Sequence, residues 1–349
     1  MKRILAAWVL YACMCAGACA EIQRYGGSGN DVILDLAAGG GRTVITGYTE
    51  SSDGTLSDRT KRGHSGWVMC MDAQGNVLWN FCSRHDVNDR IRHPVIHEDG
   101  TVSVILFSQN EADEQLSEEW IHLTPDGQVI ERERIPGRGG IFFLPGERGY
   151  IQAETTAEGR RFYLIEWGGV QRRMIDFDTD ADIQLDEASG AYVLAVSMDE
   201  GYQIFALDGQ LRGREWVVRS GLPAERAYRH ILALEDGGLA AIGRENEGFG
   251  TNYVFTRWNA EGVVLSDIAL DTRDLPLWMC ETGDGLLMLD FYGTLIRTDL
   301  NGNVLRQERI EVPGSARGMA ALPDGRALIA CRRGEEGQED VWTTTVEAP

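Results

Sequence analysis

An all-β fold is predicted by three features of this sequence. Apolar runs alternate with glycine-rich turns, no segment shows helical periodicity, and one unit recurs at a spacing of about 40–50 residues. The second half of the unit is clearest in WVMCMDAQGNVLWNFC (67–82), WIHLTPDGQVIERERI (120–135) and YVFTRWNAEGVVLSDI (253–268). A repeat of this length is typical of arrays and propellers, so we predict a seven-bladed β-propeller.

The first half of each unit is predicted to be a hairpin of two strands, A and B, around a turn rich in Asp-Gly or Gly-Gly. Tight hairpins need positive φ angles, which glycine tolerates. The flanking runs are apolar with little alternation, as expected of strands buried on both faces between neighbouring blades. These hairpins are expected at residues 32–48, 91–107, 141–154, 182–196, 229–243, 276–290 and 317–331.

The second half is predicted to be a hairpin of strands C and D, and its last copy is split. The complete copies turn at Gly75, Gly127, Gly168, Gly209, Gly262 and Gly302. After the last A–B hairpin only VWTTTV (341–346) remains, whereas IQRYGG (22–27) precedes the first blade in the register of a strand D. We therefore predict that the C-terminus supplies strand C of the last blade and the N-terminus its strand D, which closes one domain of residues 21–349.

Residues 1–20 have the pattern of a secretory signal peptide, with a basic start, an apolar stretch and the small residues Ala18 and Ala20 before the cleavage site. The apolar stretch is too short to span a bilayer comfortably. Alternatively, Cys19 or Cys13 is the acylated cysteine of a bacterial lipoprotein, although both depart from the usual lipobox. We expect a secreted or cell-envelope protein, either freely exported or lipid-anchored.

The chain is strongly acidic, with a formal net charge of −21. Nucleic acid and anionic membrane surfaces are discounted as partners, because both would be repelled. No segment after the leader is apolar enough to be transmembrane, and no Cys/His cluster suggests a metal site. We expect a monomer that recognises a ligand or protein partner.

Four cysteines follow the leader: Cys70, Cys82, Cys280 and Cys331. An even number in an oxidising compartment allows disulfides without requiring them, so their state stays open. Pairing around Gly75 would set Cys70 opposite Trp79, which places Cys82 out of register for a bridge to Cys70.

Three segments at the start of the chain form one pattern: GGSGND (26–31), GYTESSDG (47–54) and WVMCMDAQGNVLW (67–79). They resemble the GGSGxD, GyTxSxDG and W…DxxGnxxW unit of secreted bacterial β-propellers, with Gly66 where that unit usually has Asp before its Trp. The resemblance implies the fold and export, in a family largely without assigned activity. The unit endings are also similar to quinoprotein-like propellers, but the tryptophan-docking motifs of quinone-dependent dehydrogenases are not visible, so no cofactor is expected.

The loop of residues 51–66 is the longest on the face that carries the B–C and D–A loops. Asp53, Asp58 and the intervening hydroxyls offer oxygen ligands for calcium, but EF-hand spacing is absent. A solvated, turn-rich loop is the alternative, and we assign no metal ligands.

Aligning the A strands on their turns gives a candidate binding site. Arginine recurs at one position and histidine or tryptophan at the next, near the mouth of the central channel: Arg92, His93, Arg229, His230, Trp278 and Arg317. Converging guanidiniums suit bidentate capture of a carboxylate, and Trp278 offers a stacking face for a sugar or aromatic group. The alternative is that the arginines pair with carboxylates of neighbouring blades and that His93, His230 and Trp278 pack between blades.

These features predict an extracytoplasmic binding module for a small anionic ligand, glycan or protein at the channel mouth. A cell-envelope scaffold lipoprotein is the alternative. A polysaccharide hydrolase or lyase is a third possibility, because the acidic loop EADEQLSEE (111–119) contains paired carboxylates. No G-x-S-x-G elbow, Walker loop or dinucleotide fingerprint is present, and no catalytic residue is assigned.

Overall fold

A computed structural model describes most of the chain. The described residues are 22–56, 63–83, 88–109, 116–135, 141–143, 149–156, 159–166, 170–177, 183–188, 191–198, 201–207, 213–214, 226–247, 250–272, 274–283, 285–335 and 338–347. For most strand residues between 141 and 227, and for Arg229, only the backbone is described. The predicted signal peptide lies outside the described residues.

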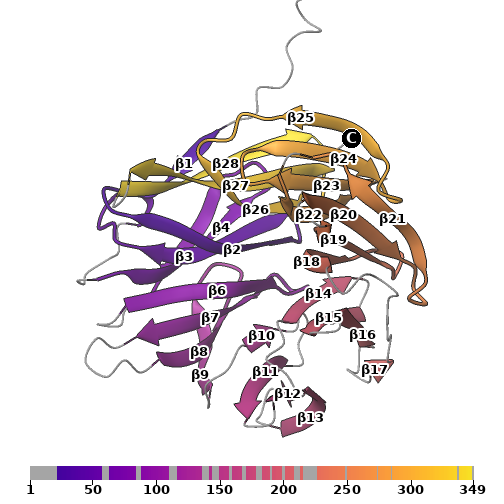
Figure 1. Cartoon of the computed structure of the whole chain (residues 1–349). Helices are drawn as coiled ribbons and strands as arrows, with labels where there is room; N and C mark the ends of the chain where they lie inside the picture. The colour runs from indigo at the N-terminus through magenta and orange to yellow at the C-terminus, as the bar shows by residue number, and fades with distance from the viewer. Residues whose placement is uncertain are drawn as a thin grey trace, which may run out of the picture.

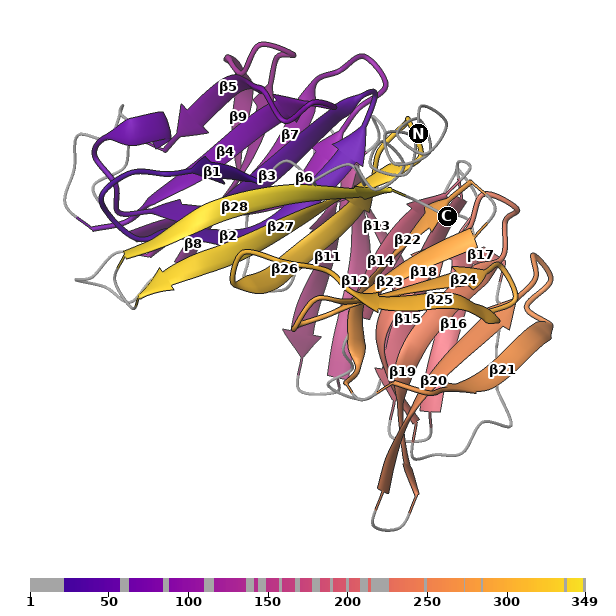
Figure 2. The same cartoon turned by 90° about the horizontal axis from the view of Figure 1, so that it is seen from above.

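The described strands form four-stranded antiparallel sheets, called blades below, in which consecutive strands pair (Figures 1 and 2). The first contains β2 (Asp31–Gly39), β3 (Arg42–Thr49), β4 (Ser65–Asp72) and β5 (Val77–Cys82), with the 3-10 helix η1 (Gly54–Leu56) between β3 and β4. The second contains β6 (Asn88–Ile96), β7 (Val102–Gln109), β8 (Leu116–Leu123) and β9 (Val129–Ile135). The next blade contains β10 (Ile141–Phe143), β11 (Gly149–Thr156), β12 (Gly159–Glu166) and β13 (Val170–Phe177). The one after it contains β14 (Ile183–Ala188), β15 (Ala191–Met198), β16 (Gly201–Leu207) and β17 (Gly213–Arg214).

The C-terminal part of the chain continues the pattern. One blade contains β18 (Arg226–Ala233), β19 (Leu239–Glu247), β20 (Gly250–Trp258) and β21 (Val264–Leu270), and the next contains β22 (Pro276–Thr282), β23 (Gly285–Asp290), β24 (Thr294–Asp299) and β25 (Val304–Arg309). The remaining one combines β26 (Ser315–Ala321), β27 (Arg326–Glu335) and β28 (Gln338–Glu347) with β1 (Gln23–Tyr25).

The predicted closure by both chain ends is confirmed. Strand β1 pairs antiparallel with β28, with Gln23 opposite Thr343 and Tyr25 opposite Val341. Figures 1 and 2 show the yellow strand β28 beside the indigo strands of the first blade. The N-terminal strand therefore completes the C-terminal blade and joins it to the first one.

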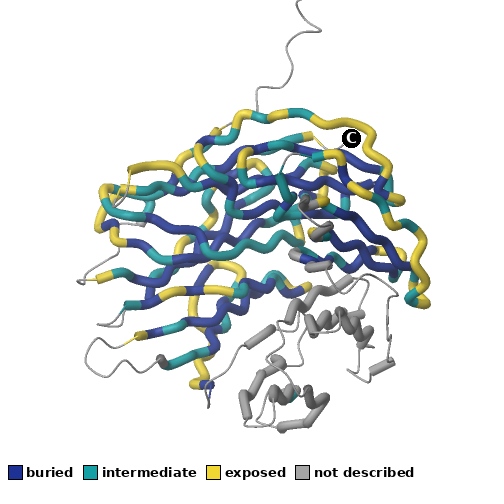
Figure 3. The backbone as a smooth tube through the Cα atoms, viewed as in Figure 1, coloured by how far each residue is buried: buried dark blue, intermediate teal, exposed yellow. Residues whose placement is uncertain are grey.

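The core lies between neighbouring blades, which explains why the strands are apolar on both faces. Along β4, Trp67 and Met69 pack into a cluster shared with the C-terminal blade, whereas Val68 and Cys70 pack into a cluster shared with the second blade. Successive residues of a strand point to opposite faces, so each blade presents one set to each neighbour. Figure 3 shows buried residues through the inner strands and exposed ones along outer strands such as β25.

In the first and second blades, the turn between the third and fourth strands receives a side chain from the preceding blade. The indole Nε1 of Trp79 donates to the carbonyl of Pro125 at 2.9 Å, and the phenol of Tyr25 donates to the carbonyl of Gly75 at 2.6 Å. A Cβ on Gly127 would lie 2.6 Å from the Trp79 ring, so only glycine fits beneath this indole. Glycine at these turns thus serves both the hairpin and the contact between blades.

The GGSGND and GYTESSDG segments bind each other through the carboxylate of Asp31. It accepts hydrogen bonds from the backbone N–H of Gly27 at 2.9 Å, from the Ser51 hydroxyl at 2.9 Å, and from the Thr49 hydroxyl. Ser51 in turn accepts from the N–H of Gly29 at 2.9 Å. Burial raises the pKa of Asp31, and these hydrogen bonds oppose the rise. The motif therefore ties the loop after β1 to the end of β3.

The four cysteines are free thiols in the structure. The predicted register is confirmed, since Cys70 pairs with Trp79 across β4 and β5. Burial raises the pKa of Cys70 to about 11 and those of Cys280 and Cys331 to about 12, which keeps all three protonated and unreactive at neutral pH.

Candidate functional site

The position at which arginine recurs in the alignment is a β-bulge. The first strand of a blade carries one extra residue there, and the pairing with the second strand shifts across it. The extra residues are Leu34, Arg229, Leu277 and Arg317 in β2, β18, β22 and β26, and the shift in β6 spans His93 and Pro94. Because bulges bend a strand and redirect side chains, the sequence repeat marks redirected positions on the first strands of these five blades.

The bulge in β6 is held by a carboxylate of the first blade. His93 has a φ of 54°, a left-handed conformation that non-glycine residues rarely adopt. Its N–H donates to Oδ2 of Asp35 at 3.1 Å, and the same oxygen lies 3.8 Å from Nδ1 of His93 and 3.9 Å from Nε of Arg92. Asp35 therefore holds the bulge by a hydrogen bond and lies near the base of the Arg92 side chain.

The imidazole of His93 is partly buried, with 34% of its side-chain surface exposed to solvent. Burial lowers the pKa of His93. The Arg92 guanidinium lowers this pKa further, whereas the Asp35 carboxylate raises it. The ring also packs edge-on against Phe107, with the centroids 6.3 Å apart.

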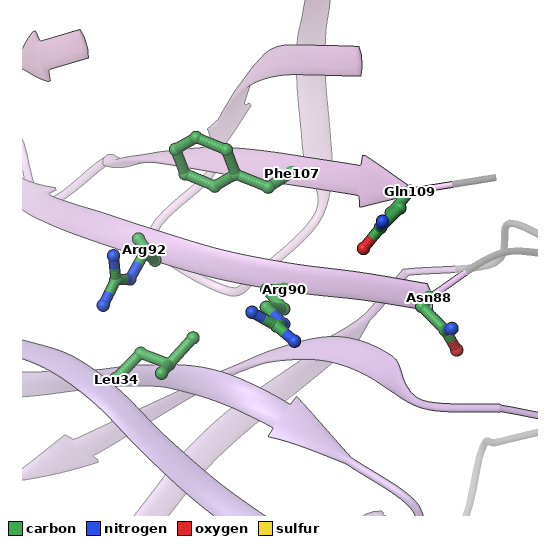
Figure 4. A pocket seen from close by; sticks show the side chains of 6 residues that line it. All are labelled: Leu34, Asn88, Arg90, Arg92, Phe107 and Gln109. Atoms are coloured by element: carbon green, nitrogen blue, oxygen red, sulfur yellow. The ribbon is translucent and has the colours of Figure 1, made fainter. Parts of the chain in front are cut away.

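A pocket of about 240 Å³ lies beside this bulge (Figure 4). The described residues that line it are Leu34, Asn88, Arg90, Arg92, Phe107 and Gln109, and we call it the arginine pocket. Register places Phe107 opposite Arg90 and Gln109 opposite Asn88 on the paired strands β6 and β7. Leu34, the bulged residue of β2, completes the lining from the neighbouring blade.

The positive charges of the two guanidiniums in the arginine pocket are only weakly neutralised by nearby carboxylates. Arg90 lies over the Tyr48 ring, with Cζ 5.6 Å from the centroid, and no carboxylate of the described residues is within ion-pair distance of it. Arg92 is 47% exposed and reaches Asp35 only at 3.9 Å. Two arginines with spare donors in one concave site are suited to bind an anion.

The other predicted site residues lie on blades away from this pocket. His230 forms a hydrogen bond to the backbone of Met279 on the next blade, and burial lowers its pKa to about 4. Trp278 packs against the apolar cluster between its own blade and the C-terminal one. Arg317 lies over Phe291, with Cζ 5.4 Å from the ring centroid. The side chain of Arg229 lies outside the described residues.

Of the predicted residues whose side chains are described, only Arg92 lines the arginine pocket, and His93 lies in the adjacent bulge. Sequence reasoning missed Asn88, Arg90, Phe107 and Gln109. A signal for two of them was present, because Asn88, Arg90 and Arg92 alternate with the buried residues Asp89 and Ile91 along β6.

No group of three or more histidine, cysteine or acidic side chains within the described ranges is placed to hold a metal ion. In the loop considered for calcium, the Asp53 carboxylate accepts a hydrogen bond from the N–H of Ser28 at 2.6 Å. Asp58 lies outside the described residues. Nor do the described residues contain a helix long and apolar enough to cross a membrane.

Glu118 of β8 lies opposite Phe107 in the register of the second blade. Burial raises its pKa to about 7, and its Oε2 accepts no hydrogen bond from the described residues. A carboxyl whose pKa is raised by folding stabilises the fold at low pH, and this contribution is lost as pH rises from about 4.5, its unfolded value, to about 7.

The Glu118→Gln variant is therefore expected to lose less stability than the native protein between pH 5 and pH 8, since glutamine stays neutral. The urea midpoints of both proteins at the two pH values measure this. Glu119→Gln is the control, because its carboxylate lies 3.8 Å from the Arg132 guanidinium. An unchanged pH dependence in Glu118→Gln would contradict the assignment.

No protein-family model matches this chain, and no curated protein matches it in sequence. Its structure is similar to that of virginiamycin B lyase from Staphylococcus aureus, with 12% identity, a TM-score of 0.60, and coverage of 94% of this chain and 100% of that one. It is also similar to the Dos1 propeller, with 9% identity, a TM-score of 0.55, and coverage of 93% and 95%. The fold is that of a β-propeller. At such low identity the likeness carries no activity with it.

Proposed function

We propose that this protein is an exported seven-bladed β-propeller, formed by residues 21–349, that binds a small anionic ligand in the arginine pocket. The seven four-stranded sheets formed by the described strands support the blade count. Export rests on the leader-like pattern of residues 1–20. The ligand is small because the cavity, at about 240 Å³, is below the usual range for drug-sized ligands.

One observation carries the binding proposal: Arg90 and Arg92 line the same pocket on an acidic chain. Residues two apart on a strand share one face and lie about 6.6–6.8 Å apart along it, so both guanidiniums can reach one anion. The overall charge of −21 makes this local positive site a selective place for an anion rather than part of a basic surface.

We propose binding rather than acid–base catalysis. None of the described residues that line the arginine pocket carries a carboxyl or an imidazole. General acid–base catalysis uses side chains such as His, Asp, Glu, Lys, Tyr or Cys within hydrogen-bond reach of the substrate, and the described lining contains none of these types.

The Arg90→Gln/Arg92→Gln double variant is expected to bind anions at least 100-fold more weakly than the native protein, because two charge-assisted contacts of about 1.5–3 kcal/mol each are lost. Isothermal titration with glucuronate, succinate, acetate and inorganic phosphate measures this. Arg306→Gln is the control, because Arg306 is 65% exposed on β25 and pairs with Glu308. The proposal fails if none of these anions binds the native protein, or if the double variant binds them equally well.

A further inference from the structure

The arginine pocket has two chemically different ends. Asn88 and Gln109 face each other across β6 and β7 at one end, and Arg90 faces Phe107 in the next pair of the same face. Arg92 follows two residues further along β6. Directly opposed residues of an antiparallel pair have Cβ atoms about 4.5–5.5 Å apart, so these side chains form a compact floor. Figure 4 shows the amides at one end and the two arginines along β6.

The amide end is suited to hydroxyl groups rather than to charge. A side-chain amide offers a carbonyl acceptor and an NH₂ donor, and an alcohol can use both. Asn88 already accepts weakly from the N–H of His64 at 3.4 Å through its Oδ1. Gln109 is exposed, and the described residues give its side-chain amide no hydrogen-bond partner. A free carboxylate or phosphate bound at the arginines would leave these amides unused.

Phe107 and Leu34 form the apolar part of the pocket lining. Phe107 belongs to the cluster around Ile105 and Trp120, which fixes its ring, and Leu34 lines the pocket from the neighbouring blade. The electron-rich face of an aromatic ring favours the weakly positive C–H groups of a saturated ring. The ligand thus requires a carboxylate, a C–H-bearing ring and hydroxyl groups, with the hydroxyl groups at the amide end of the pocket.

We infer that the arginine pocket binds a uronic acid, with the sugar carboxylate on Arg90 and Arg92, its ring against Phe107 and its hydroxyls on Asn88 and Gln109. This assignment rests on the proposed function and names its ligand class. The volume of about 240 Å³ suits a single sugar ring, either free or at the end of a chain.

Isothermal titration and saturation-transfer NMR with glucuronate, galacturonate, glucose and succinate test this. One of the two uronates is expected to bind at least tenfold more tightly than glucose or succinate. Gln109→Ala is expected to weaken uronate binding about fivefold and to leave succinate binding unchanged. Gln307→Ala is the matched control, because Gln307 is an exposed glutamine on β25. Phe107→Leu is expected to reduce saturation transfer to the sugar ring protons.

The two proposals can fail separately. If succinate binds as tightly as both uronates and Gln109→Ala affects neither, the uronic acid assignment is overturned and anion binding stands. If glucose binds as tightly as the uronates, recognition of the carboxylate is overturned. If no anion binds in a manner that depends on Arg90 and Arg92, both proposals fall.

Discussion

Replacement of Asp31 by alanine is expected to destabilise the protein by about 3 kcal/mol or more. Asp31 and its partners Thr49 and Ser51 are completely buried, so the variant leaves two buried hydroxyls and the N–H of Gly27 without their acceptor. Each buried polar group left unpaired costs about 1–3 kcal/mol. Asp31→Asn keeps one carbonyl acceptor and should lose less.

Asp53→Ala is the matched control for this prediction, since Asp53 belongs to the same motif but is exposed. It accepts from the N–H of Ser28 at the surface, where water can replace it. Chemical denaturation and thermal unfolding of the two variants and the native protein provide the comparison. Equal losses in Asp31→Ala and Asp53→Ala would show that the buried network does not carry the stability assigned to it.

Deletion of residues 22–25, which removes β1, is expected to destabilise the protein by about 5 kcal/mol or more and to cause self-association. The deletion removes the buried Tyr25 side chain, and truncation of a buried aromatic residue alone costs about 3–5 kcal/mol. It also exposes the edge of β28, and an unpaired edge strand is a template for pairing with other chains.

Size-exclusion chromatography with light scattering and thermal unfolding measure these effects. A synthetic peptide of residues 22–27 is expected to restore the monomer and part of the stability by pairing with β28. Arg24→Ala is the control, because it removes only an ion pair to Asp340 in which Arg24 is 56% exposed, worth less than about 1 kcal/mol. A monomeric deletion variant with native stability would refute the structural role of β1.

Much of the fold was predictable because its signals are local. The turn glycines of the C–D hairpins have positive φ wherever the structure describes them, for example 86° at Gly75 and 83° at Gly302. Counting strands around these turns was enough to predict that both chain ends share one blade. The pairing of Cys70 with Trp79 followed from the turn at Gly75, since a hairpin turn fixes the register of its strands.

The candidate site was predictable only in part, because it depends on contacts that no local pattern shows. The alignment found the position of Arg92, but not that it borders a bulge, which depends on the pairing of β6 with β7. Phe107 and Gln109 enter the pocket through that same register, and Leu34 enters it from another blade. His230 and Trp278 match the pattern of the site but lie in contacts between blades, as the alternative interpretation stated.

The closure of the ring also determines when its first and last strands can pair. Arg24 and Asp340 form an ion pair across 316 residues of sequence, so β1 cannot pair with β28 until all the residues between them have been made. Contacts of such long sequence separation form late in folding, because the whole intervening chain must be brought together first. Until β28 has been made, β1 lacks its partner and the ring stays open. For a chain proposed to be exported, the ring can therefore close only once β1 and β28 are on the same side of the membrane.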